Sequence, residues 1–230
     1  MIEEDRVQFL ERQLSAIYAE HGIDYELKWN RVRRYRPDIE AVCAGINLLI
    51  NTDASFEAIV VEKATYEKWQ DGDHESAFYL TYGLLAAHIA KARPDSFEFW
   101  IDGRSDSYDK RPEVMQIITN YRSRRLTGAA ELAGVKMVDS KANAIVQMAD
   151  VLIGAVTADT HRYLLGGNDL NEGKEEVITR LATMIGWDRL IYDTYPNSEF
   201  NVWHFPPEFR AVPATRHVLL ASQRLQASTT

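Results

Sequence analysis

Four residues with polar or small side chains recur at helical spacing in the stretch from Val138 to Val156. Asn143, Gln147, Asp150 and Gly154 stand at i, i+4, i+7 and i+11, so a helix would place them on one face. Most neighbouring residues are apolar, and a helix that is apolar on most sides is normally buried. The sequence therefore predicts that Asp150 lies near the interior. A buried carboxylate requires a metal ion, a proton, an arginine or backbone N–H groups, which leaves a catalytic and a structural role open.

Further acidic residues lie on or at the ends of predicted strands, where ligands gather in α/β sheets. Glu26 lies on the polar face of one strand, Asp102 ends a second, and Asp139 follows a third. If these acids converge with Asp150, they could hold two Mg²⁺ or Mn²⁺ ions about 4 Å apart. Such ions activate a water molecule and stabilise the leaving oxygen of a phosphodiester. We therefore expect Mg or Mn as the cofactor, with two metal ions as the fullest form of the site.

Lys28 shares the predicted strand face of Glu26, where its charge could stabilise a phosphate or a transition state. Each of these residues also has a structural alternative. Glu26 and Lys28 could form an exposed ion pair, Asp102 could belong to a turn, and Asp139 could cap a helix. Residue types and spacing do not choose between these alternatives.

A local cluster of basic residues follows Glu26, interleaved with the aromatic residues Trp29 and Tyr35. Its members are Lys28, Arg31, Arg33, Arg34 and Arg36. Basic side chains bind phosphate backbones, and exposed aromatic rings stack on bases. Trp29, Arg31, Arg33 and Arg34 are therefore candidate substrate-binding residues, with nucleic acid as the expected partner. The alternative is a solvated loop without a ligand.

The hydrophobic pattern predicts helices alternating with strands along the chain. Helices are expected at residues 3–20, 37–50, 74–92, 112–126, from 144 onward and at 172–187; strands are expected at 23–29, 56–61, 96–101, 135–138 and 200–205. This alternation indicates an α/β fold with parallel strands and helices on both faces of a sheet. We expect a single domain over residues 1–205 and a C-terminal extension over residues 206–230.

Charge, cysteine content and hydropathy exclude several classes of protein. The 230 residues carry a net charge of −8, which argues against a broadly basic surface that coats nucleic acid. The single cysteine, Cys43, cannot form an internal disulfide bond, as is typical of proteins from a reducing compartment. The chain has no apolar run of about 18 residues and no signal-peptide pattern. We therefore expect a cytoplasmic protein that does not enter a membrane.

Three blocks of residues occur in an order that resembles a known family. They are Glu26-Leu-Lys-Trp29, Trp100-Ile-Asp102 and Val138-Asp-Ser-Lys with Gln147-Met-Ala-Asp150. Together they resemble the family catalogued as domain of unknown function 3800, over about residues 3–205. The resemblance implies a ribonuclease-H-like mixed sheet flanked by helices and a metal-dependent nuclease acting on DNA or RNA. It assigns Glu26, Asp102 and Asp150 as metal ligands, Lys28 and Gln147 as supporting residues, and Asp139 as a family acid.

The chain departs from this family at its start. Family members begin with a strand that carries Asp-Glu-Ser-Gly and a hairpin, whereas this sequence starts at the helix that would follow them. Either the coding sequence begins upstream, or the protein is a shortened relative with an incomplete site. The first alternative favours a nuclease, with phage defence or mobile elements as its setting by family association. The second favours an inactive scaffold that binds nucleic acid or a protein, with a second copy or a partner chain covering an exposed sheet edge.

Overall fold

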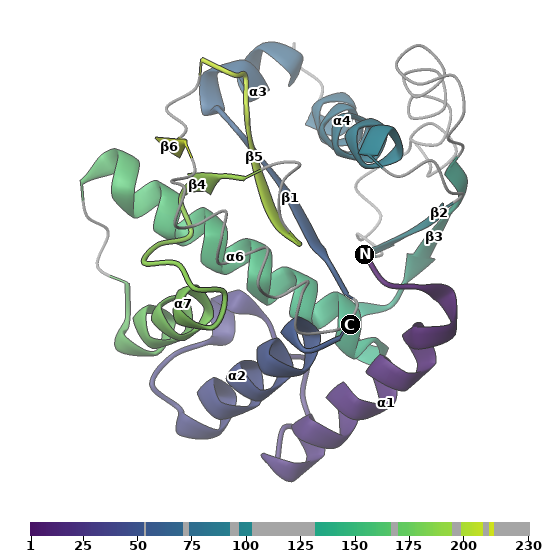
Figure 1. Ribbon diagram of the computed structural model, residues 1–230, viewed down its shortest axis with the longest axis vertical. Coiled ribbons are helices and arrows are strands. Elements are labelled where there is room, and N and C mark those ends of the chain that lie inside the picture. Colours follow the sequence, from purple (N-terminus) through teal and green to yellow (C-terminus); the bar gives the residue numbers. More distant parts are fainter. Residues whose placement is uncertain are drawn as a thin grey trace. The chain divides into compact units, whose positions relative to one another are not determined.

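The computed structural model describes residues 1–52, 54–70, 74–92, 97–102, 132–166, 170–194, 199–208 and 212–213. The chain divides into two compact units, each assembled from separate stretches. Figure 1 labels their helices and strands. The first unit comprises Met1–Ala58, Ser140–Trp203 and Arg210–Thr230, and the second comprises Ile59–Asp139 and His204–Phe209. The single domain expected over residues 1–205 stays a prediction. Most of the expected extension, from residue 214 onward, lies outside the described residues.

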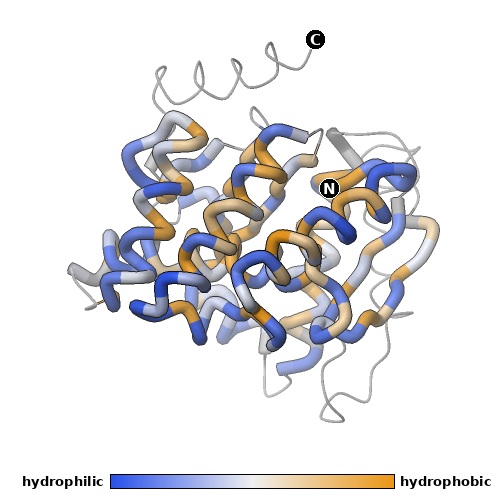
Figure 2. The backbone as a smooth tube through the Cα atoms, turned by 90° about the horizontal axis from the view of Figure 1, so that it is seen from below, coloured by the Kyte–Doolittle hydropathy of each residue, from blue (hydrophilic) through white to orange (hydrophobic). Residues whose placement is uncertain are grey.

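The first unit is mainly helical. Its elements are α1 (Glu4–Glu20), the 3₁₀-helix η1 (Trp29–Arg31), α2 (Arg36–Ile50), the 3₁₀-helix η2 (Ser140–Ala142), α6 (Ala144–Leu165), α7 (Glu172–Met184) and the short strands β4 (Tyr192–Asp193) and β6 (Val212–Pro213). Helix α6 packs against α1, α2 and α7. Apolar and polar residues alternate along the helices in Figure 2, as expected for helices that bury one face. The core therefore forms around α6.

Local sequence signals define the ends of α6. The Asn143 side chain accepts a hydrogen bond from the Val146 N–H at 3.0 Å, which caps the N-terminus. The Glu11 carboxylate of α1 accepts the Ala144 and Ile145 N–H groups at 2.6 and 3.1 Å. At the other end Gly166 has a φ of 71°, a left-handed conformation that glycine adopts without strain. An acid on α1 therefore ties two helices together at a helix N-terminus, where negative charge is favourable.

The second unit contains α3 (Lys63–Gln70), α4 (His74–Ala92), β2 (Phe97–Asp102) and β3 (Leu132–Val138). Strands β2 and β3 are parallel, and their register pairs Asp102 with Val138. The buried side chains of Tyr79 and Ile101 form a core cluster in this unit. The strands β1 (Phe56–Val61) and β5 (Phe200–Phe205) pair with each other. The boundary between the two units falls within each of these strands.

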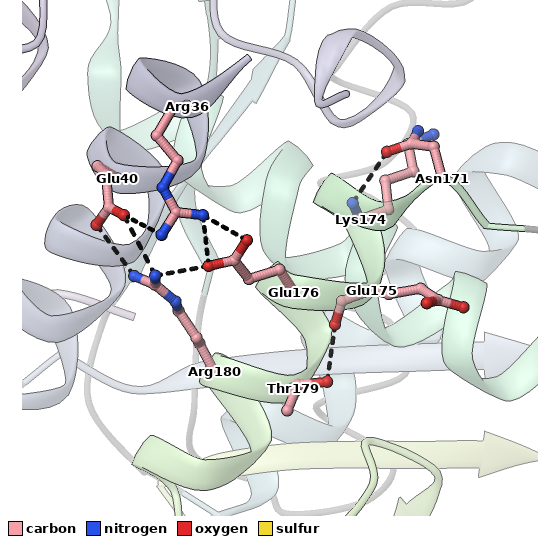
Figure 3. A network of polar contacts seen from close by, with 8 residues as sticks. All are labelled: Arg36, Glu40, Asn171, Lys174, Glu175, Glu176, Thr179 and Arg180. Carbon is pink, nitrogen blue, oxygen red and sulfur yellow. Dashed lines mark hydrogen bonds and ion pairs between the residues drawn. The ribbon is translucent and has the colours of Figure 1, made fainter. Parts of the chain in front are cut away.

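Charged side chains join α2 to α7 in a four-membered network (Figure 3). Arg36 pairs with Glu40 at 2.8 Å and with Glu176 at 2.6 Å, and Arg180 pairs with the same two carboxylates at 3.0 and 2.6 Å. Each carboxylate therefore pairs with two guanidinium groups. A network of this kind contributes more than isolated surface pairs do. It holds the start of α2 against α7.

The structure confirms a mixed α/β fold with small parallel sheets. The helices predicted at residues 3–20, 37–50, 74–92, from 144 onward and at 172–187 are present within a few residues, as are four of the five predicted strands. The predicted helix at residues 112–126 lies outside the described residues, and helix α3 was not predicted. None of the helices in the described part of the chain has the length and apolar character needed to span a bilayer.

The strand predicted at residues 23–29 is wrong. Residues 26–28 have no regular secondary structure, and η1 begins at Trp29. The alternation of polar and apolar side chains is real, because Leu27 is buried whereas Glu26 and Lys28 are partly exposed. The N–H groups of Leu27 and Trp29, however, bond to side chains of α6 instead of a neighbouring strand. A period of two identifies extended backbone, and it does not identify the partner of that backbone.

Candidate functional site

The polar stripe of α6 binds an extended segment of the same unit. We call residues 26–34 the basic loop, because they carry Lys28, Arg31, Arg33 and Arg34. The Leu27 N–H donates to Oε1 of Gln147 at 2.9 Å, and the Trp29 N–H donates to Oδ2 of Asp150 at 2.8 Å. Gln147 and Asp150 are three residues apart on α6. They therefore accept hydrogen bonds from two loop residues, Leu27 and Trp29, that are two residues apart. These contacts supply hydrogen-bond partners that a sheet would otherwise supply.

Gln147 uses both ends of its amide group. Besides accepting from Leu27, it donates through Nε2 to the Ser140 carbonyl at 2.8 Å and to the Lys141 carbonyl at 3.4 Å. Its side chain is 5% exposed. The residue therefore joins the basic loop, η2 and α6, and its position leaves it a supporting role and no direct access to a ligand.

Two glycines allow the helices to approach the basic loop closely. A Cβ atom built on Gly154 of α6 would lie 2.2 Å from Cγ of Trp29, and one built on Gly173 of α7 would lie 1.4 Å from the Arg33 carbonyl oxygen. Neither distance is compatible with a side chain. The Nδ2 atom of Asn171, at the start of α7, also donates to the Val32 carbonyl at 3.1 Å. The loop backbone is therefore held by α6 and by the N-terminus of α7.

Glu26 is engaged by neighbours on several elements. Its carboxylate accepts a hydrogen bond from the Ser140 hydroxyl and pairs with Nζ of Lys28 at 2.9 Å, and its side chain is 8% exposed. Desolvation by burial opposes ionisation, but the hydrogen bonds from Ser140 and Lys28 and the charges of Lys28 and Arg31 outweigh it. The pKa of Glu26 is therefore lowered from its ordinary value, and the group is ionised at neutral pH.

The cations of the basic loop differ in their surroundings. Arg31, Arg33 and Arg34 are exposed, and Arg34 pairs with Glu172 at 3.0 Å. Trp29 is half-buried, and Nζ of Lys174 lies 5.0 Å from the centroid of its ring, a distance typical of a cation–π contact. The structure thus places the candidate substrate-binding residues Trp29, Arg31, Arg33 and Arg34 on one short segment with a defined backbone.

An open groove of about 440 Å³ lies beside the basic loop. Its lining includes Trp29 of the loop and six residues of α6: Asp150, Ile153, Gly154, Thr157, Ala158 and His161. Residues at these spacings share a helical face, so the groove follows α6 for about three turns. His161, which the sequence places on a face similar to that of Asp150, lies in this groove.

Asp150 is exposed, so the prediction that it lies in the interior is wrong. The buried acid of α6 is Asp159, which is 4% exposed and accepts the Leu190 N–H at 2.7 Å. The buried apolar residues of α6 include Met148, Val151 and Val156, whereas Asp150 faces the basic loop and the groove. The structural alternative, in which backbone N–H groups satisfy Asp150, describes its contact with Trp29.

The remaining two predicted metal ligands belong to the second unit. Asp102 ends β2 and Asp139 follows β3, and both are exposed. Because β2 and β3 are parallel and Asp102 pairs with Val138, the two acids lie at the same edge of this sheet. Among the described residues, no group of three or more histidine, cysteine or acidic side chains could hold a metal ion. The expected Mg or Mn cofactor stays a prediction.

Comparison with known proteins assigns the chain to no family. No family model matches the chain, and no curated protein or solved structure matches it significantly.

Sequence reasoning missed the contribution of α7 to this site. Asn171, Gly173 and Lys174 all contact the basic loop, and none was a candidate. A local signal does exist, because Asn171 caps α7 by accepting the Lys174 N–H at 3.1 Å, and acidic residues follow in the first turn. That signal identifies the start of a helix, but it contains no information about which segment packs there.

Proposed function

We propose that the protein binds the sugar–phosphate backbone of a nucleic acid through the basic loop. The observation that carries this proposal is a loop backbone held by two helices while the side chains of Arg31, Arg33 and Arg34 remain exposed. A backbone ordered in advance reduces the conformational entropy lost on binding. Cations on such a segment are well suited to phosphates at fixed spacing.

The charge of the whole chain favours a local site over a broad one. With a net charge of −8, most of the surface repels a polyanion, so binding depends on the few cations of the basic loop. Glu172 neutralises part of the charge of Arg34, and Glu26 part of that of Lys28. We therefore expect modest affinity that falls steeply with salt, with a slope set by about three phosphate contacts.

Salt-dependent binding of short oligonucleotides tests this function. Replacement of Arg31, Arg33 and Arg34 by glutamine should reduce affinity at least tenfold and flatten the dependence on salt. A matched control replaces the exposed arginines Arg6, Arg12 and Arg189 by glutamine, which changes the net charge equally. Equal loss of affinity in both triple variants would refute the loop as the binding segment.

A second candidate function is metal-dependent hydrolysis of nucleic acid, and Asp102 and Asp139 of the second unit favour it. They lie at the carboxyl edge of parallel strands, where α/β proteins bind ligands. Magnesium commonly binds through one or two carboxylates together with waters and substrate phosphates. The family resemblance points to the same chemistry, in a ribonuclease-H-like nuclease, and adds Glu26 and Asp150 as ligands. The alternative is an inactive scaffold that binds without cleaving.

Cleavage assays with Mg²⁺ or Mn²⁺ on single- and double-stranded DNA and RNA separate these alternatives. A nuclease should lose activity in Asp102→Asn and Asp139→Asn and keep it in Asp24→Asn, a control at an exposed acid. Glu26→Gln and Asp150→Asn test the ligands that the resemblance adds. Binding without cleavage under all conditions would favour the scaffold, and cleavage that survives both Asp102→Asn and Asp139→Asn would reject those two residues as metal ligands.

A further inference from the structure

The groove beside the basic loop is lined by residues other than the three arginines proposed to bind phosphates. Small residues at positions 154, 157 and 158 of α6 leave the space open, and Trp29 of the loop borders it. At a rise of about 1.5 Å per residue, the α6 face from Asp150 to His161 extends about 16 Å, which accommodates a base with its sugar. The volume of about 440 Å³ falls within the range of small-molecule sites.

We propose that this groove receives one unstacked nucleobase with an exocyclic amino group, from a strand whose phosphates bind the basic loop. The inference rests on the proposed function and adds the class of substrate.

The charge of Asp150 selects a base over a phosphate. The Asp150 carboxylate lines the groove and is exposed, so it repels a phosphate there. Lys28 also lines the groove, but its charge is paired with Glu26 at 2.9 Å, whereas Arg31 and Arg33 lie exposed on the adjoining loop. Ile153 and Ala158 supply apolar surface, which suits the flat face of a base. The phosphates therefore belong on the loop, and the base belongs in the groove.

Asp150 also discriminates among bases. An ionised carboxylate only accepts hydrogen bonds, and it has about four lone-pair sites, one of which receives the Trp29 N–H. An amino group, such as N4 of cytosine, can donate to another site. Thymine presents the acceptor O4 at the same position, which the carboxylate repels. We therefore expect cytosine to bind more tightly than thymine at equal backbone charge.

The groove further selects single strands. In a duplex the amino group of cytosine pairs with guanine and the faces of the base are stacked. Sequence-dependent recognition by pockets accordingly targets unpaired bases that can leave the stack. A duplex of the same length could contact only the basic loop.

Binding of oligomers with equal length and charge tests the inference, using fluorescence anisotropy on the intact chain. The probes are oligo-dC, oligo-dT and an oligomer of abasic sites. Wild-type protein should bind oligo-dC about fivefold or more tightly than the other two, as one additional hydrogen bond to a charged group allows. Equal affinity for all three, with the salt dependence intact, would overturn the groove inference and leave phosphate binding by the loop in place. Absence of binding by every oligomer would overturn both.

Two variants of α6 locate the effect in the groove. Asp150→Asn keeps an oxygen that accepts the Trp29 N–H and adds donors for O4 of thymine, so the preference for oligo-dC should vanish or reverse. Ala158→Phe fills the groove and should lower oligo-dC affinity to that of the abasic oligomer. The matched control is Ala149→Phe, at an exposed position of α6 outside the groove lining, which should keep the preference. A preference unchanged in both Asp150→Asn and Ala158→Phe would refute the groove as the base site.

Discussion

The basic loop of the first unit and the β2–β3 edge of the second unit both carry acids predicted as metal ligands, but they use these acids differently. Beside the loop, Asp150 accepts a backbone N–H group and Glu26 accepts a hydroxyl group. At the edge, Asp102 and Asp139 follow strands whose backbone is already paired. Extended backbone without a sheet partner needs other acceptors, and Asp150 supplies one to the Trp29 N–H.

This comparison predicts that substitutions around the loop affect folding and that substitutions at the edge do not. The loop contacts involve a buried amide and two glycines without room for a side chain. The edge acids are exposed, and exposed substitutions usually change the free energy of unfolding by about 0.5 kcal/mol or less.

The largest effect is expected for Gly173→Ala. The added methyl group would overlap the Arg33 carbonyl oxygen, so the loop or α7 has to shift, and the free energy of unfolding should fall by about 3 kcal/mol. Urea denaturation measures this loss. The control is Gly134→Ala on β3, where an added Cβ meets only the Glu98 side chain at 3.7 Å, and stability should change by about 0.5 kcal/mol or less. Equal effects in both variants would contradict the close packing of the loop.

Gln147→Leu comes next. It has a similar volume but removes the acceptor for the Leu27 N–H and the donor for the Ser140 carbonyl. Leaving such groups unsatisfied in a buried position should cost about 2 kcal/mol in denaturant unfolding. Asp102→Asn, the comparison at the strand edge, should leave the denaturation midpoint unchanged. If Gln147→Leu were as stable as the wild type, the two hydrogen bonds would not support the loop.

A smaller effect is expected for Asp150→Ala, because the Asp150 side chain is exposed and water can replace it at the Trp29 N–H. The loss should be about 1 kcal/mol. Asp150→Asn keeps an oxygen acceptor and should lose less than half of that amount. The two variants should differ in urea denaturation, and an equal loss in both would mean that the charge of Asp150, and not the hydrogen bond, supports the loop.

The effect that depends most on conditions concerns pH, and it develops only below pH 6.5. Burial lowers the pKa of His204 from 6.5 to about 4, so the unfolded state takes up a proton first and stability is lost as pH falls from 6.5 to 4. The pKa of Glu26 is lowered from 4.5, so its contribution is present above pH 4.5 and is lost as pH falls below that value. His204→Phe should flatten the first range and Glu26→Gln the second in denaturation measured against pH. A profile unchanged in either variant would show that its residue does not govern that range.

Much of the local structure was predictable from the sequence. The strand at residues 56–61, the helix at 74–92 and the strand at 200–205 have the predicted bounds, because hydrophobic period and flanking residues act within a few positions. The helical face shared by Gln147, Asp150 and Gly154 was also correct, whereas Asn143 lies just before α6 as its N-cap. Each of these four residues either caps α6 or contacts the basic loop.

The wrong predictions concern segments whose structure depends on what packs against them. Residues 23–29 alternate like a strand, yet two N–H groups of this segment pair with α6. Asp150 was expected inside because its helix is apolar on most sides, whereas the interior acid of α6 is Asp159, paired with the Leu190 N–H. Both errors have one cause, since periodicity reports the conformation of a segment and not what lies against it.

By itself, the sequence determined the helices of the first unit, the parallel strand ends that carry Asp102 and Asp139, and the concentration of arginines after Trp29. Only the tertiary structure decided that Gly173 of α7 and Gly154 of α6 meet the same loop, and that Asp150 binds backbone at the mouth of a groove. The physical reason is the distance along the chain over which each interaction acts. Helix caps and hydrophobic periods act over a few residues, whereas the Trp29–Asp150 bond joins positions 121 residues apart, and it forms only when α6 and the loop pack together.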